Sequence, residues 1–132
     1  MTNNLSEAIQ LIKGSSPNKT ERKLGNNTYG RINSDGSVSI RMHSTDTDIV
    51  TFNTDNTVTL DTGGWLINMT YSATTKQRMN KYLPYGYHVF KHNHEWYISL
   101  GRDFVEFPMV HDGALGSFKY YTTINLDNNS IR

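Results

Sequence analysis

The sequence has no cysteine among its 132 residues, which excludes disulfide bonds, thiolate zinc sites and a cysteine nucleophile. It also has no apolar run near the roughly 18 residues that a membrane-spanning helix needs. Residues 1–14 lack a basic segment followed by a long apolar one, so we expect no signal peptide. The absence of cysteine fits a reducing cytoplasm. We therefore expect a cytoplasmic protein without a membrane partner.

The sequence also has no large excess of positive or negative charge. The formal net charge is +1, so no overall field drives the protein onto nucleic acid or an acidic membrane. The sequence contains no serine nucleophile elbow, phosphate-binding loop, dinucleotide fingerprint or zinc-binding helix motif. It has no fixed-period repeat of the kind that marks a solenoid or propeller. These absences favour a protein that is not an enzyme, although they leave the question open, and we expect no cofactor.

The composition and length instead predict one folded domain. Apolar residues make up 36% of the sequence and aromatic residues 11%, which is too much for a disordered tail. A chain of this length can bury a substantial hydrophobic core.

Short strands dominate the predicted secondary structure. Apolar and polar residues alternate through 38–42 and again at 50–52 and 58–60, which predicts an antiparallel meander with one buried face. Strands are also expected at 28–32, 65–69, 104–107 and 118–124, and a hairpin at 87–100.

Two helices complete the expected fold. A short one runs from Asn4 to Lys13, and a second from about Thr75 to Leu83, where Met79 and Tyr82 pack inward. The fold class is α+β: a twisted, mostly antiparallel sheet of about six to eight strands with one packed helix and a short N-terminal helix. The expected organisation is an N-terminal helix at 1–14, a polar linker at 15–27, a single β-rich domain at 28–126 and a polar tail at 127–132.

The densest polar cluster is the first candidate for chemistry. His43, Asp46 and Asp48 lie within six residues, and a histidine with two carboxylates can act as a base with its orienting group or bind a metal ion. The alternative is a loop in which aspartate and threonine side chains cap backbone groups. Because no second group follows at a recognisable ligand spacing, we expect no metal site.

A second candidate lies at the start of the predicted helix at 75–83. Thr74, Thr75, Lys76 and Arg78 would place hydroxyl groups and positive charge beside the free N–H groups of a helix N-terminus, which favours phosphate. The alternative is an ordinary helix cap with solvated charges.

The third candidate is a contact surface for nucleic acid or another partner, formed by Lys81, Tyr82, Tyr85 and Lys91. Basic and aromatic side chains together suit single-stranded nucleic acid. The alternative is that the tyrosines belong to the core. We expect the nearby His88, His92 and His94 to be exposed hairpin residues rather than metal ligands, and Trp65 and Trp96 to be core anchors.

Several of these segments resemble a group of small, uncharacterised phage and prophage proteins. The matching segments are Asn26 to Tyr29, Asp35 to Ser37, His43 with Asp48 to Phe52, Gly63 to Trp65, Thr74 to Asn80 and Tyr82 to Pro84. The sequence departs from the group's pattern by an extra Thr-Asp in the segment HSTDTDIV and by a longer passage after Trp65. The resemblance implies a phage setting and no specific activity.

The leading hypothesis is a non-enzymatic phage accessory protein that binds a host or viral macromolecule, most simply a protein, in the cytoplasm of an infected bacterium. One alternative is a nucleic-acid or nucleotide binder that uses the Thr74–Arg78 helix start. Another is a small nuclease or hydrolase that uses His43 with Asp46 or Asp48. Self-association also stays open, because several strands are expected at sheet edges.

Overall fold

The computed structural model describes residues 2–42, 47–62, 72–92, 95–101, 103–106, 109–112 and 117–131. In this part of the chain there are two helices, α1 (Leu5–Lys13) and α2 (Ser72–Tyr82). The strands are β1 (Glu21–Gly25), β2 (Thr28–Ile32), β3 (Val38–Met42), β4 (Thr47–Phe52), β5 (Thr57–Asp61), β6 (Tyr87–His92), β7 (Glu95–Leu100), β8 (Asp103–Glu106), β9 (Met109–Asp112), β10 (Ser117–Asn125) and β11 (Ser130–Ile131). The predicted α+β class, the packed helix and the short N-terminal helix are confirmed. The strand expected at 65–69 lies outside the described residues.

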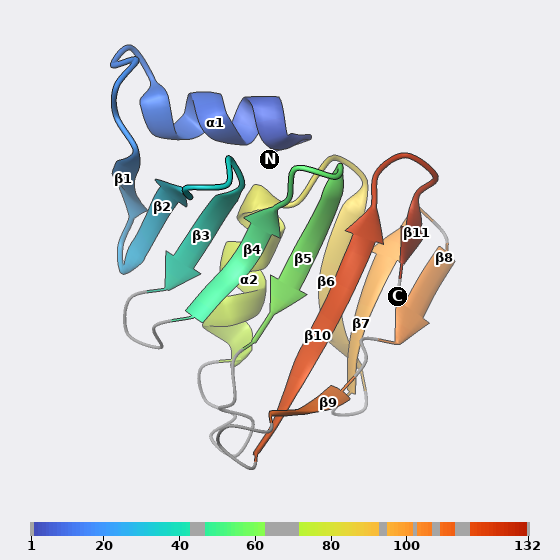
Figure 1. Ribbon diagram of the computed structural model, residues 1–132. Coiled ribbons are helices and arrows are strands. Elements are labelled where there is room, and N and C mark those ends of the chain that lie inside the picture. The colour runs from blue at the N-terminus through green and yellow to red at the C-terminus, as the bar shows by residue number, and fades with distance from the viewer. Residues whose placement is uncertain are drawn as a thin grey trace.

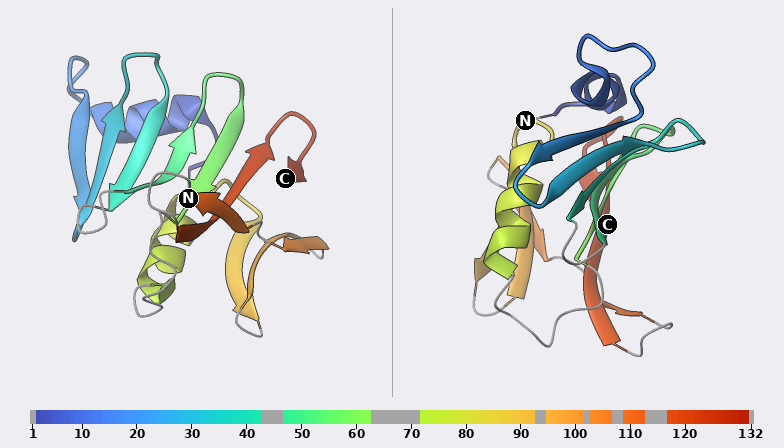
Figure 2. Two further views of the ribbon diagram at one scale, coloured as in Figure 1. Left: turned by 60° about the horizontal axis from the view of Figure 1, so that its bottom comes forward. Right: turned by 90° about the vertical axis from the view of Figure 1, so that its left-hand side faces the viewer.

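The described strands form two antiparallel sheets (Figure 1). The larger sheet has eight strands in the order β1-β2-β3-β4-β5-β10-β11, with β9 paired to β10, and the smaller has the order β6-β7-β8. Both helices and the smaller sheet lie on one side of the larger sheet (Figure 2). Its other face is turned toward the viewer in Figure 1, with none of the described helices in front of it. Neither described helix has the length and apolar composition that crossing a bilayer requires.

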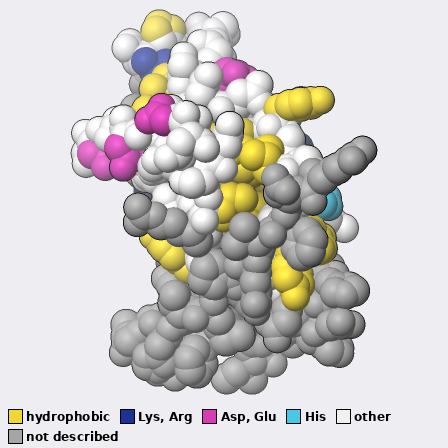
Figure 3. Space-filling view, turned by 90° about the vertical axis from the view of Figure 1, so that its right-hand side faces the viewer, with side chains coloured by type: hydrophobic (Ala, Val, Ile, Leu, Met, Phe, Trp, Pro, Cys, Tyr) yellow, Lys and Arg dark blue, Asp and Glu magenta, His cyan; other side chains and the backbone are white. Residues whose placement is uncertain are grey.

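The hydrophobic core fills the space between these layers. It includes Val58, Leu60 and Ile124 from the larger sheet and Val89 and Ile98 from the smaller, each at most 1% exposed. Helix α2 adds Met79 and Tyr82 to the same cluster, as its spacing predicted, with Leu83 directly after it. Seen from the side of β8 and β11, hydrophobic side chains reach the surface in the middle of the molecule (Figure 3).

Helix α1 begins and docks as its sequence predicts. The side chain of Asn4 caps its first turn by accepting a hydrogen bond from the Glu7 N–H at 2.9 Å. Ala8 and Ile12 are fully buried. The helix comes close to β2 because Gly30 has no side chain: a Cβ atom there would lie 2.2 Å from Cδ1 of Ile12.

Two segments that were predicted to lie outside the β-rich domain contain strands. Residues 15–27, expected as a polar linker, contain β1, and residues 127–132, expected as a polar tail, contain β11. Both are edge strands of the larger sheet, and edge strands carry more polar residues than central ones because they have fewer packing neighbours. Strand β1 is also tied to α1, since Nε of Arg22 donates to the Ile12 carbonyl oxygen at 2.9 Å.

A bulge in β4 explains why two consecutive residues are buried there. Ile40 pairs with Val50, but the next residue, Arg41, pairs with Asp48. The extra residue, Ile49, therefore turns into the core beside Val50, and both are at most 1% exposed. Asp48 stays half-buried beside Arg41.

Two turns of the larger sheet have the same construction. In the β2–β3 turn the Asn33 side chain donates to the hydroxyl oxygens of Ser37 and Ser39, and in the β4–β5 turn Asn53 donates to Thr57 and Thr59 in the same way. In each turn an aspartate, Asp35 or Asp55, accepts from the backbone N–H and the hydroxyl of the residue two positions later. The sequence pattern that encodes this geometry, Asn-x-Asp-x-Ser/Thr-Val-Ser/Thr, recurs after 20 residues. It is too short and has too few copies to define a solenoid.

Candidate functional site

Of the first predicted cluster, the structure describes only Asp48. Its carboxylate forms an ion pair with Arg41, with 2.9 Å between Nε and Oδ1, and the two side chains are about one-third exposed. His43 and Asp46 lie outside the described residues. The catalytic hypothesis for this cluster therefore stays a prediction, and the one carboxylate that is described already has a cationic neighbour.

The helix-start residues have separate surroundings. Helix α2 begins at Ser72, earlier than expected, and the side chain of Thr74 lies outside the described part of the chain. Thr75 is 1% exposed. The ammonium group of Lys76 lies 4.7 Å from the ring centroid of the buried Trp96, while Arg78 donates to the Asn26 carbonyl oxygen at 3.4 Å. Lys76 and Arg78 thus contact different neighbours, and the phosphate-binding hypothesis for this helix start stays a prediction.

The third predicted group divides between core and surface. Tyr82 is 4% exposed, and burial raises the pKa of its phenol, an effect that the positive charge of Arg78 partly offsets. Lys81 is exposed, with its ammonium group 5.7 Å from the Tyr82 ring centroid. Tyr85 is 78% exposed. The side chain of Lys91 lies outside the described residues.

The histidine and tryptophan predictions are tested in part. His88 is exposed on β6, as expected, and stacks with Phe90 at 6.4 Å between ring centroids. Trp96 is a core residue, 1% exposed. The side chain of His92, and His94 and Trp65 altogether, lie outside the described residues. In the part of the chain that the structure describes, no group of three histidine or acidic side chains could hold a metal ion.

One face of the larger sheet, which we call the uncovered face because none of the described helices lies in front of it, brings together residues that the sequence pattern does not connect. Strand registers place one residue from each of six neighbouring strands directly opposite the next. We call these residues the polar row: Glu21, Arg31, Ser39, Thr51, Thr59 and Thr123. With strands about 4.8 Å apart, the polar row is roughly 24 Å long. It begins with two opposite charges and continues with hydroxyl groups alone.

Several hydroxyl groups of the polar row are held by neighbouring side chains. Oγ of Ser39 and Oγ1 of Thr51 are 3.4 Å apart and share a hydrogen bond. The side-chain amides of the two repeated turns also reach the row: Asn33 donates to Ser39 and Asn53 donates to Thr59, both at 2.9 Å. These bonds fix the rotamers of the central hydroxyl groups. Ser39 is only 3% exposed, so the preorganised polar surface in this part of the face is formed by the half-buried Thr51 and Thr59.

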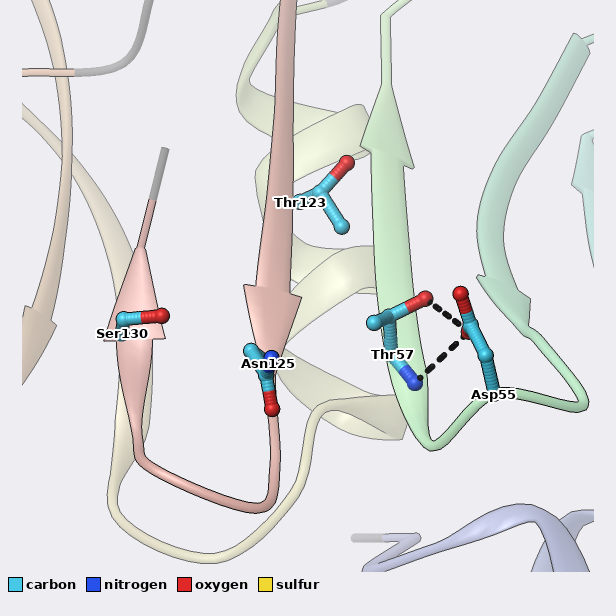
Figure 4. Close-up of a pocket in the computed structure, with 5 residues that line it drawn as sticks. All are labelled: Asp55, Thr57, Thr123, Asn125 and Ser130. Atoms are coloured by element: carbon cyan, nitrogen blue, oxygen red, sulfur yellow. Dashed lines mark hydrogen bonds between the residues drawn. The ribbon is translucent and has the colours of Figure 1, made fainter.

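A small groove lies at the β10 end of the polar row (Figure 4). Its volume is about 240 Å³, and its lining comes from β5, the turn before it, β10 and β11. The lining residues, which we call the groove residues, are Asp55, Thr57, Thr123, Asn125 and Ser130. Thr57 pairs with Asn125, and Asn125 pairs with Ser130, so the groove crosses three adjacent strands.

The polar groups of the groove differ in how far the protein itself satisfies them. Asp55 and Thr57 bond to each other, and Oδ1 of Asn125 accepts from the Asp127 N–H at 2.9 Å. Among the described residues, no hydrogen bond involves Nδ2 of Asn125 or the hydroxyl groups of Thr123 and Ser130. The groove therefore offers donors and acceptors that are available to solvent or a ligand.

One signal in the sequence points to this face. The outward positions of β5 and β10 include Thr57, Thr59 and Thr123 together with Asp61, and β4 carries Thr51. Threonine hydroxyl groups are therefore frequent on a face where charged residues are usual. Alternation along each strand predicts the strand itself, but it does not say which polar positions of different strands lie side by side. Only the strand order places Thr123 beside Thr59, 64 positions earlier in the sequence.

Comparison with known proteins identifies the chain at the family level. Residues 5–123 match the family described as Kyanoviridae Gp96 protein. The chain therefore belongs to this phage protein family, and the resemblance to small uncharacterised phage proteins is confirmed. No curated protein and no solved structure is significantly similar to it.

Proposed function

We propose that this member of the Kyanoviridae Gp96 family is a non-enzymatic accessory protein that binds a host or viral macromolecule in the cytoplasm of the infected bacterium. The binding surface is the uncovered face of the larger sheet. The observation that carries the proposal is the polar row, in which six strands place hydrogen-bonding side chains in register along roughly 24 Å.

The chemistry of the face supports a role beyond solubility. A sheet face that only meets water needs no cross-strand order in its polar groups. Here the central hydroxyl groups are fixed by amide donors from two turns of identical construction. Such preorganisation lowers the entropy lost when a partner binds. The surface is also long enough to meet an extended partner rather than a single small molecule.

The test compares a variant of this face with a variant of the opposite side. Arg31→Ala with Thr51→Arg changes the face at two positions of the polar row and leaves the net charge unchanged. Gln77→Arg introduces the same arginine side chain at an exposed position of α2 and adds one positive charge. Each tagged protein is mixed with lysate of infected cells, and retained species are quantified by mass spectrometry. We expect at least one species that the native protein and Gln77→Arg retain in equal amounts. The variant Arg31→Ala with Thr51→Arg should retain at least tenfold less of that species. Equal retention by both variants, with equal melting temperatures, would contradict the proposal.

One observation favours a second candidate function, nucleic-acid binding by the surface at the end of α2. Tyr85 is 78% exposed, and the exposed Lys81 and half-buried Arg78 precede it. Exposed aromatic rings with nearby cations suit single-stranded nucleic acid. Lys76 does not belong to this surface because its ammonium group lies over Trp96.

The second candidate predicts a salt-dependent affinity for a labelled oligothymidylate. Arg78→Ala with Lys81→Ala should weaken binding and reduce the slope of log K against log salt by about 0.7 for each phosphate that the variant no longer neutralises. Lys13→Ala with Lys19→Ala, which removes equal charge from the last turn of α1 and the loop after it, is the matched control. An affinity that does not depend on salt, or that both double variants reduce equally, rejects this candidate.

A further inference from the structure

We infer that the groove binds a neutral, hydroxyl-rich ligand, one sugar unit of a glycan chain, so that the partner of the uncovered face is a polysaccharide. This inference rests on the proposed function, because it names the chemistry of the partner at the same face. The observation behind it is the convergence of unengaged donors and acceptors on a groove of about 240 Å³ (Figure 4).

The polar groups of the groove match sugar hydroxyls in kind. A hydroxyl group both donates and accepts, as do the side chains of Thr123 and Ser130, and Nδ2 of Asn125 donates only. In the described structure these three groups make no hydrogen bond with the protein. A ligand with several neighbouring hydroxyl groups can satisfy all three at once, as an apolar ligand cannot. A phosphate can accept from all three as well, so the charge of the groove has to distinguish these two ligands.

The charge of the groove argues against an anionic ligand. Asp55 is the one charged residue among the groove residues. Asp127 is close by, because its Oδ1 accepts from the Asn56 side chain in the same turn region at 2.6 Å. Two carboxylates repel a nucleic-acid backbone, but each can accept a hydrogen bond from a sugar hydroxyl.

The aromatic ring of Tyr121 belongs to the same strand, β10, two residues before the groove residue Thr123. Tyr121 and Thr123 are both half-buried and project to the uncovered side of β10, while Thr122 between them is buried. Residues two apart on a strand are separated by about 7 Å. A tyrosine ring offers a flat apolar surface with a polar edge, which suits the C–H face of a pyranose ring adjoining the unit in the groove.

The size and position of the groove favour a polymer. Its volume of about 240 Å³ is below the roughly 300–1,000 Å³ of sites for drug-sized ligands, so it holds one unit rather than a whole ligand. The groove also opens onto the polar row through Thr123, which belongs to both. Further units of a chain can therefore continue along the hydroxyl groups of Thr59 and Thr51.

The experiment titrates the intact protein with neutral oligosaccharides and follows the side-chain amide signals of asparagine by NMR. The probes are hexamers of α-1,4-glucose, β-1,4-glucose and β-1,4-N-acetylglucosamine, with oligothymidylate and hexalysine as charged comparisons. We expect at least one neutral hexamer to shift the Asn125 side-chain signal in a saturable way. A shift caused only by oligothymidylate or hexalysine, or by none of the probes, would overturn the inference.

Conservative variants separate binding in the groove from binding elsewhere. Thr123→Val with Ser130→Ala removes two hydroxyl groups that make no bond with the described protein, so the fold should be retained. We expect this pair to weaken hexamer binding about tenfold. Ser6→Ala removes an exposed hydroxyl of α1, outside both the polar row and the groove, and should change hexamer affinity less than threefold. Equal effects of the two changes would place the ligand elsewhere and overturn the inference.

The inference and the proposed function fail in different ways. If no hexamer binds but the lysate species is still lost from Arg31→Ala with Thr51→Arg, the face binds a partner that is not a glycan. If a hexamer binds in the groove but no lysate species depends on the face, the groove is a saccharide site and the macromolecular role of the polar row is rejected.

Discussion

The side chain of Asn80 forms hydrogen bonds with both backbone groups of Val89, as a neighbouring strand would. From α2, its side-chain Nδ2 donates to the Val89 carbonyl oxygen at 2.9 Å, and its Oδ1 accepts from the Val89 N–H at 2.7 Å. Val89 lies on β6, which is at the edge of the smaller sheet among the described strands. An edge strand leaves backbone groups unpaired and open to other chains. One amide side chain thus closes part of this edge and joins the helix to the sheet.

Replacing Asn80 by Ala should therefore cost about 2–3 kcal/mol of unfolding free energy, because two part-buried backbone groups lose their partners. Asn80→Asp keeps the acceptor for the Val89 N–H but sets a carboxylate oxygen against the Val89 carbonyl oxygen, so it should cost at least as much. Urea unfolding of both variants measures the difference, with the exposed Gln77→Ala as a control. A loss below about 0.5 kcal/mol for Asn80→Ala would show that water replaces the amide without penalty.

A side chain at residue 30 should destabilise the fold as long as Ile12 retains its full length. A Cβ atom at residue 30 would meet Cδ1 of Ile12 at 2.2 Å and Cδ1 of Leu24 at 3.0 Å. We expect Gly30→Ala to cost about 1–3 kcal/mol through overpacking. Combining it with Ile12→Val, which removes the clashing methyl group, should cost less than the sum of the two single changes. If thermal unfolding shows that the free-energy changes of Gly30→Ala and Ile12→Val simply add in the double variant, α1 moves away from β2 at little cost.

The β2–β3 turn should make the free energy of unfolding depend on pH in the acid range. Hydrogen bonds from the Ser37 hydroxyl and then from the Ser37 backbone N–H hold the pKa of Asp35 below its ordinary value of 3.8. A pKa that is lower in the folded state adds stability above the unfolded value, and this contribution is lost as pH falls through the folded pKa. The loss should therefore appear below about pH 4.

NMR titration of the Asp35 carboxyl measures that pKa directly, and Asp35→Asn should remove this contribution to the pH dependence of unfolding between about pH 2 and 6. If the carboxyl titrates at or above 3.8, the turn geometry does not stabilise the charge.

Lys76 should contribute to folding rather than to ligand binding. Its ammonium group lies 4.7 Å from the ring centroid of Trp96, and a half-buried cation–π contact contributes about 0.5–1 kcal/mol or more. Lys76→Met keeps most of the aliphatic stem and removes the charge, so we expect a loss of that size in chemical unfolding. Gln77→Met, at the neighbouring exposed position, should change little. If Lys76→Met leaves the free energy of unfolding unchanged or raises it, the contact with Trp96 does not stabilise the fold and Lys76 is again a candidate for phosphate binding.

The sequence by itself determined the local elements. Alternation at Val38, Ile40 and Met42 encodes β3, and the spacing of Met79 and Tyr82 gives α2 its buried side. These patterns depend only on which side of a strand or helix faces water. The same rule failed for β1 and β11, because short edge strands are stabilised by pairing and by contacts such as Arg22 with the end of α1 rather than by an apolar pattern.

Only the tertiary structure decided which residues form the polar row and the groove. Thr59 and Thr123 lie far apart in the sequence and become neighbours because β10 pairs with β5 across the sheet. The tertiary structure also buries Thr75 and places the ammonium group of Lys76 over the ring of Trp96. Strand order depends on long-range packing of the whole core, and a local pattern of residue types does not encode it.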